Sequence, residues 1–185
     1  MRMKEIIKKA EEYALSEIEK YGSPSKINLE TSNKKGEELA KLLNADLEIV
    51  QVGTRLMDIK LGEAKAKGKI KEHVRMSSEA SKQFLSPFDL QKEEVDKIIN
   101  CVEGHHGTAK WLCKEAEICA NADCYRFLLI RNWLLSLVDL EGNLKLLEEK
   151  AEEKWKVLSL DICKKELESD YKLIKEIIRR AKQDD

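Results

Sequence analysis

One acid and three histidines are the residues of this 185-residue chain whose types and spacing best suit chemistry. Asp58 stands in the largely apolar stretch "VGTRLMDIKLG", and the histidines are His73, His105 and His106. A buried carboxylate must be paired, protonated or bound to a metal, because its unpaired burial costs several kcal/mol. Histidine is the commonest protein ligand of divalent transition metals, and aspartate adds an anionic oxygen to such sites. The four residues therefore raise the hypothesis of a divalent-metal site.

Asp58 and His73 each have a simpler interpretation as well. Arg55 lies three residues before Asp58 on the same predicted helical face, so the two side chains can form an ion pair with no metal. His73 has the polar neighbours Glu72 and Arg75, and it can be an ordinary helix histidine rather than a ligand or a phosphate donor. Both interpretations stay open at the level of sequence.

His105 and His106 are adjacent in the loop sequence "GHHG". Neighbouring side chains on a regular backbone point apart, so at most one of the two rings is expected to enter a pocket. One ring can instead bind the last carbonyl groups of the preceding helix. The pair is still the strongest candidate for chemistry in the chain.

A second acid, Asp123, lies in the apolar stretch "ANADCYRF" and also needs a partner. Arg126, three residues later, is one candidate, and a metal or substrate is the other. Arg126 and Arg131 can also hold a phosphate, because arginine binds phosphate through two parallel hydrogen bonds. The alternative is that these arginines pair with helix acids or extend to solvent.

Composition excludes several classes of protein. The 34 basic and 35 acidic residues nearly cancel, so no footprint for nucleic acid or an anionic membrane is expected. The five cysteines form no C-x-x-C pair, which excludes a signature for a disulfide framework or a zinc ribbon. The longest apolar stretch, "FLLIRNWLLSLV", has 12 residues, fewer than the roughly 20 of a membrane span, and no secretory leader is visible. We expect a cytoplasmic protein.

The elements that must position these residues are helices. Apolar residues recur at helical spacing almost throughout, with Asp46 as an expected N-cap and Thr108 as the cap of a long later helix. The predicted helices span residues 6–18, 29–43, 47–59, 70–84, 92–103, 108–138, 144–155 and 162–181, with residues 61–69 as a connector. The last two are highly charged, which favours packing support or a homodimer through the C-terminal helices over chemistry.

In order and spacing, these motifs resemble the HD-domain (His-Asp) metal-dependent phosphohydrolases. The matching segments cover roughly residues 25–135, and they are "NADLEIVQVGTRLMDIKLG", "EHVRMSSEASKQFL", "EEVDKIINCVEGHHG" and "EAEICANADCYRFL". The resemblance implies an all-α HD-domain-like helical bundle with a helical C-terminal extension. We expect an HD-like core over residues 1–138 and an extension, packed on the same domain, over residues 139–185.

The resemblance also assigns roles to residues. It implies metal ligands at Asp58, His73, His106 and Asp123 and catalytic residues at Asp58, His105 and His106. Together with the arginine chemistry described above, the expected substrate-binding residues are His73, Arg126, Arg131 and Asn28. Three positions depart from the pattern: Asn28 replaces the first His, Met57 the His of the His-Asp pair, and Asn121 the first acid of the later motif. A thioether does not bind Mg²⁺ or Mn²⁺, and an amide is a weak ligand, so the usual ligand set is incomplete.

Two functions follow from this resemblance. The first is hydrolysis of a nucleotide or another small phosphoester, with a divalent ion such as Mn²⁺, Mg²⁺, Ni²⁺, Fe²⁺ or Zn²⁺ in a reduced site. The second is a catalytically inactive HD-fold module, without the metal, that binds a ligand or a protein. An unrelated helical protein is a third interpretation, and it predicts that Asp58, His73 and His106 lie far apart.

Overall fold

The computed structural model describes residues 2–139 and 142–182, and within them every regular element is helical. The helices are α1 (Arg2–Tyr21), α2 (Lys26–Leu42), α3 (Leu47–Leu56), α4 (Leu61–Ala66), α5 (His73–Leu85), α6 (Lys92–Gly104), α7 (Lys114–Leu128), α8 (Ile130–Asp139), α9 (Leu144–Val157) and α10 (Asp161–Ala181). A short 3-10 turn, η1 (Ile70–Glu72), precedes α5. The all-α class predicted from the sequence is confirmed, and no described helix is long and apolar enough to cross a membrane.

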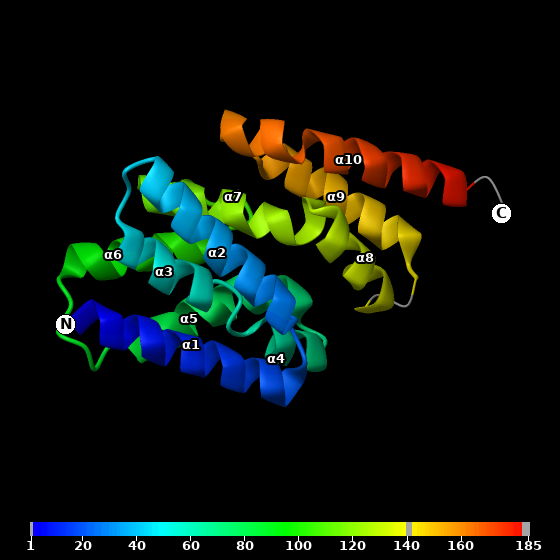
Figure 1. The fold of residues 1–185 in the computed structure, drawn as a ribbon. Coiled ribbons are helices and arrows are strands. Elements are labelled where there is room, and N and C mark those ends of the chain that lie inside the picture. The colour runs from blue at the N-terminus through cyan, green and yellow to red at the C-terminus, as the bar shows by residue number, and fades with distance from the viewer. Residues whose placement is uncertain (1, 140–141, 183–185) are drawn as a thin grey trace.

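Helix α7 is the centre of the bundle. It contacts α2, α3, α6, α8, α9 and α10, and it lies between the N-terminal helices and the α9–α10 hairpin (Figure 1). A helix surrounded in this way must be apolar or paired on every face, and most residues of α7 are buried. The two charged side chains that α7 buries near its C-terminal end, Asp123 and Arg126, therefore need partners on neighbouring helices.

Two glycines allow the central helices to approach closely. A Cβ atom on Gly53 of α3 would lie 2.6 Å from the Cβ atom of Cys101 on α6, and one on Gly36 of α2 would lie 2.8 Å from Thr54. Separations this short do not occur between real side chains, so a larger residue at either position would push the helices apart. The close packing fixes the end of α3, and with it the position of Asp58.

Local signals in the sequence set several helix ends. The side chain of Asp46 accepts hydrogen bonds from the backbone N–H groups of Glu48 and Ile49, which confirms it as the N-cap of α3. The first helix ends at Tyr21, within the predicted stop "YGSPS". The residues predicted as a connector (61–69) instead include α4, because fully buried Ala64 packs this short helix into the bundle.

The long helix predicted over residues 108–138 is wrong. Helix α7 begins at Lys114, since the preceding loop folds back on α6: the side chain of Asn100 accepts from Leu112 N–H and donates to the carbonyl of Lys110. The helix also breaks at Leu129, where the next N–H group, that of Ile130, donates to the carboxylate of Asp170 on α10. A side chain from a distant helix thus caps α8.

Helices α9 and α10 form an antiparallel hairpin that packs on α7 and α8 (Figure 1). The division of the chain into a core (1–138) and an extension (139–185) stays a prediction. Its predicted boundary adjoins residues 140–141, which lie outside the described residues.

Candidate metal centre

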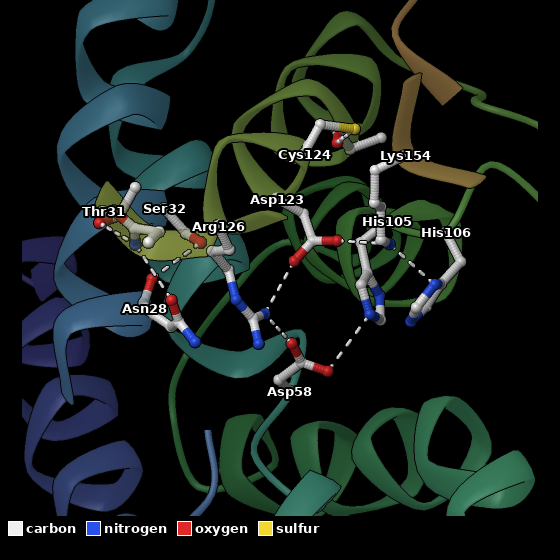
Figure 2. A network of polar contacts seen from close by, with 12 residues as sticks. Asn28, Thr31, Ser32, Asp58, His105, His106, Asp123, Cys124, Arg126 and Lys154 are labelled. Atoms are coloured by element: carbon white, nitrogen blue, oxygen red, sulfur yellow. Dashed lines mark hydrogen bonds and ion pairs between the residues drawn. The ribbon is translucent and has the colours of Figure 1, made fainter. Parts of the chain in front are cut away.

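Residues from five parts of the helical bundle form one polar cluster. Asp58 lies in the turn between α3 and α4, His73 is the first residue of α5, and His105 and His106 follow the end of α6. Asp123 and Arg126 project from α7, and Lys154 projects from α9 (Figure 2). The proximity of Asp58, His73 and His106 contradicts the interpretation in which the resemblance is accidental and these residues lie far apart.

The two oxygens of the Asp58 carboxylate face different groups. Oδ2 accepts a hydrogen bond from Nη1 of Arg126 (Figure 2), whereas Oδ1 lies 3.4 Å from Nε2 of His105 and 3.5 Å from Nε2 of His73. Burial alone raises the pKa of Asp58, but the positive charge of Arg126 opposes burial most strongly, and that pKa is held well below its usual value. Asp58 is therefore a carboxylate at neutral pH.

The prediction of an ion pair between Arg55 and Asp58 is wrong. Helix α3 ends at Leu56, before Asp58, and Arg55 instead pairs with Glu11 of α1 and Glu37 of α2. The actual partner of Asp58, Arg126, is 68 residues away in the sequence.

Two of the histidine rings are fixed by backbone carbonyls. Nδ1 of His105 lies 2.6 Å from the carbonyl oxygen of Val102, and Nδ1 of His73 lies 2.7 Å from that of Ile70. A carbonyl only accepts, so Nδ1 carries the proton in each ring and Nε2 of the neutral ring has a free lone pair. Burial lowers the pKa of His73, which keeps that ring neutral at pH 7.

His106 stands beside these rings, with its Nε2 3.0 Å from Nε2 of His73. The expectation that His105 and His106 point apart is wrong, because their ring centroids are 4.3 Å apart. The backbone is not regular here: α6 has ended at Gly104, and Gly107 turns the chain with a φ of +67°. Burial lowers the pKa of His106 to about 4. Both adjacent rings therefore reach the cluster, and the ring of His106 is a neutral imidazole at pH 7.

The geometry and the donor set fit a divalent ion. One ligand atom from each of Asp58, His73, His105 and His106 lies within 4.8 Å of the other three. Bonds of about 2.1 Å to a tetrahedral ion place neighbouring ligand atoms about 3.4 Å apart, close to the separations of 3.0, 3.4 and 3.5 Å found here. Among the described residues, Asp58 Oδ1 and His105 Nε2 are buried without a hydrogen-bond partner. Lone pairs that converge in this way need a cation or a proton between them.

Asp123, which the resemblance implied as a ligand, has both oxygens occupied by cations. Oδ1 accepts from Nη1 of Arg126 at 2.7 Å, as the three-residue spacing predicted, and Oδ2 accepts from Nζ of Lys154 at 2.6 Å (Figure 2). Burial raises the pKa of Asp123, but Lys154 and Arg126 outweigh burial and keep that pKa below its usual value. No oxygen of Asp123 is directed at the histidines.

Lys154 is the member of the cluster that sequence reasoning missed. Its side chain is fully buried, and Nζ also lies 2.9 Å from Nδ1 of His106 (Figure 2). Leu147, Ala151 and Leu158 are buried on the same face, at spacings of seven, three and four residues from Lys154. The position of this lysine on an apolar helix face was the sequence signal that could have predicted its burial.

The other implied residues lie elsewhere or have other tasks. Oδ1 of Asn28 accepts from the side chain of Asn132 at 3.0 Å. Arg131 is exposed on α8 and joins none of the hydrogen bonds or ion pairs that link the cluster within the described residues. Met57 is buried in the core, and the side chain of Asn121 accepts from the N–H groups of Ser159 and Leu160. The departures from the family pattern thus have structural roles here.

Solved structures share this fold at low sequence identity. A predicted HD superfamily hydrolase from an uncultured Thermotogales bacterium has a TM-score of 0.67 and 15% identity, over 98% of this chain and 91% of its own. YpgQ of Bacillus subtilis has a TM-score of 0.67 and 17% identity, over 100% of this chain and 97% of its own. YpgQ in complex with ADP gives 0.68 and 18% over the same shares. The expected HD-domain-like fold is therefore confirmed.

No protein-family model matches the sequence. No curated protein matches it in sequence either.

Proposed function

We propose that this chain binds one divalent transition-metal ion through Asp58, His73 and His105 and hydrolyses a small phosphorylated molecule. One observation carries the proposal: the Nε2 lone pairs of two rings fixed at Nδ1 converge on the free oxygen of a buried carboxylate. Metal-binding histidines characteristically donate their other ring N–H to a carbonyl or a carboxylate. Two imidazoles and one carboxylate suit Zn²⁺, Fe²⁺, Ni²⁺ or Mn²⁺ better than Mg²⁺, which prefers oxygen ligands.

His106 has a separate role in this proposal. Nδ1 of His106 lies 2.9 Å from Nζ of Lys154 and 3.3 Å from Oε1 of Glu153. The closer group is the donor Lys154, which favours the tautomer with the ring proton on Nε2, the atom that faces His73. From there His106 donates a hydrogen bond to an oxygen of the substrate. A bound divalent ion supplies a Lewis acid that polarises the phosphoryl group. Asp58, His73 and His105 hold that ion, and Lys154 holds His106 in the donating tautomer.

The substrate reaches the site past His73 and His106. Their side chains are 12% and 18% exposed, whereas those of Asp58 and His105 are 9% and 0% exposed. Arg126 is buried and engaged by two carboxylates, so it is not the group that holds the phosphate. A structure of YpgQ contains ADP, which supports a small phosphorylated molecule as the substrate class. Phosphate binding by exposed Arg131 stays a prediction.

Metal analysis of the protein, purified without a chelator or a metal-affinity tag, tests the site. The wild-type chain should carry about one equivalent of a transition metal, and His73→Ala should lose it. Removal of a residue that merely orients a ligand lowers metal affinity about 10–100-fold, so removal of a ligand itself should cost at least as much. Arg75→Ala is the matched control, since Arg75 is exposed on the same helix and, among the residues that the structure describes, pairs only with Glu72 and Glu79. A wild-type chain without metal, or equal content in His73→Ala, would refute the site.

Phosphate release from ADP, ATP and p-nitrophenyl phosphate, measured with each of the four ions, tests the activity. His106→Ala should keep its metal but lose about 100–1000-fold in kcat, the scale on which one hydrogen bond to the developing charge contributes. Equal kcat in His106→Ala and the wild-type protein would remove His106 from the mechanism. Metal binding with no phosphate release from any of the three compounds would contradict the hydrolase.

The second function, a catalytically inactive module, has one observation in its favour. The cavity lined by Asp58 and Arg126 has a volume of about 10 Å³, enough for a water molecule but not for a nucleotide. This module would bind a ligand or a protein outside that cavity, and it would release no phosphate from ADP with any ion.

A homodimer through the C-terminal helices also stays a prediction. Ile162 and Leu173 of α10 are 43% and 48% exposed, which leaves apolar surface on the outer helix of the hairpin. Light scattering at several concentrations distinguishes a dimer from a monomer, and Leu173→Lys should shift a dimer toward monomer.

A further inference from the structure

The guanidinium group of Arg126 stands between two buried carboxylates. Its Nη1 donates to Oδ2 of Asp58 and to Oδ1 of Asp123 (Figure 2). All three residues are buried, with exposed fractions of 3%, 7% and 1% for Arg126, Asp58 and Asp123. An arginine usually presents two nitrogens to one carboxylate. Here one nitrogen serves two carboxylates, in the manner of a single cation held between them.

The ligand set that the resemblance implies on this side of Asp58 does not fit a metal. Met57 is a buried thioether, and the oxygen of Asn28 already accepts from Asn132. The remaining ligands would be Asp58 and Asp123, and Arg126 lies between them. An ion in this position would displace or repel a buried positive charge.

The charges around the bridge also balance without an ion. Lys154 pairs with the second oxygen of Asp123, so two buried acids face two buried bases. The three carboxylate oxygens that face Arg126 or Lys154 therefore already have cations of the protein as partners. On the histidine side, by contrast, Asp58 Oδ1 and His105 Nε2 are buried without a hydrogen-bond partner among the described residues.

We propose that Arg126 is a protein-borne cation that occupies the position of a metal ion between Asp58 and Asp123. This bridge limits the chain to the single ion site on the histidine side. The inference concerns the opposite face of Asp58 from the metal site proposed above, and it does not require that site to be filled.

Replacement of Arg126 by an uncharged residue tests this inference. Arg126→Met leaves two buried carboxylates without their bridge, and Mn²⁺ is an ion that carboxylates bind well. Addition of 1 mM Mn²⁺ should raise the midpoint of thermal unfolding of Arg126→Met by about 5–10 °C more than that of the wild-type protein, the shift expected for a ligand at about 100 times its Kd. Arg126→Met should also bind one more equivalent of Mn²⁺ than the wild-type protein.

Two variants serve as controls. Arg126→Lys retains the positive charge in the same place, so it should bind no additional Mn²⁺. Arg126→Met combined with Asp123→Asn removes one of the two carboxylates and should lose the additional shift. If Arg126→Met is unfolded without metal, refolding from urea with and without Mn²⁺ replaces the thermal measurement. Native near-ultraviolet circular dichroism should then return only with Mn²⁺.

The outcomes separate this inference from the proposed function. A wild-type chain without metal, together with Mn²⁺ uptake by Arg126→Met, supports the bridge and refutes the histidine site. One equivalent in both proteins, with equal thermal shifts, overturns the bridge and leaves the histidine site intact. Equal uptake by Arg126→Met and Arg126→Lys, or refolding that does not depend on Mn²⁺, also overturns it.

Discussion

The two sides of the Asp58 carboxylate form two contrasting regions. On the Arg126 side, every carboxylate oxygen faces a cation that belongs to the protein. On the histidine side, Asp58 Oδ1 and His105 Nε2 face each other at 3.4 Å with no hydrogen bond among the described residues. A buried polar group without a partner is costly. The contrast indicates that the carboxylate oxygens of the first side are paired as folded, although Nε of Arg126 has no partner there, whereas the second side is arranged for an ion from outside.

Asp58→Ala breaks both sides at once and should have the largest effect. It removes one carboxylate from Arg126 and the carboxylate that faces His73 and His105. We expect the free energy of unfolding to fall by about 5 kcal/mol, the upper end of the cost of removing one partner of a buried ion pair. Urea denaturation of the wild-type protein and Asp58→Ala measures this. A loss under about 1 kcal/mol would show that the Asp58 carboxylate does not stabilise both sides of the cluster.

Lys154→Met removes one cation from Asp123 on the Arg126 side and the contact with Nδ1 of His106, and it leaves the ion pair between Asp58 and Arg126 in place. Asp123 keeps Arg126 as a partner, so the expected loss is smaller, about 3 kcal/mol. The double variant Lys154→Met with Asp123→Asn removes both charges, and its loss should be at least about 1 kcal/mol less than the sum of the two single losses. Additive losses in the double-mutant cycle would contradict a direct ion pair.

The dependence of stability on low pH tests the Arg126 side through the carboxyl group of Asp123. The pKa of this carboxyl is lowered in the folded protein relative to its ordinary value of 3.8, so its contribution to stability is present above that pH and disappears as the pH falls below it. Between pH 5 and pH 2, Asp123→Asn should lose stability less steeply than the wild-type protein, by up to about 1.4 kcal/mol per pH unit. Urea denaturation across this range measures both slopes, and parallel slopes would contradict a lowered pKa.

Arg131→Ala should have the smallest effect, because exposed Arg131 belongs to neither side. A change within about 0.5 kcal/mol is expected for such a surface substitution. The metal content should be unchanged. Phosphate release with Arg131→Ala also tests the role in substrate binding: a higher KM supports it, and an unchanged KM removes it.

The helices were largely predictable because their signals are local. Apolar spacing, the Asp46 cap and the stop after Tyr21 act within a few residues of the chain. The failures occurred where a distant side chain intervened. Asp170 on α10 caps α8 at Ile130, and a buried alanine turns a predicted connector into α4.

The candidate site was predictable in its members more than in its pairings. Asp58, His73, His105 and His106 were each identified from residue type and context, and the structure brings them together. Lys154 was missed because a lysine in a charged helix is normally solvated. Its burial depends on how α9 packs on α7, which no local pattern specifies.

The sequence by itself determined an all-helical chain and the residue types that can bind a metal, since periodicity and side-chain chemistry belong to the chain alone. Only the tertiary structure decided which charge each acid meets. Asp58 pairs with Arg126, 68 residues away, rather than with nearby Arg55, because α3 ends before Asp58 and Arg55 turns to acids of α1 and α2. Electrostatic partners are set by distance in space, and packing of the helices fixes that distance.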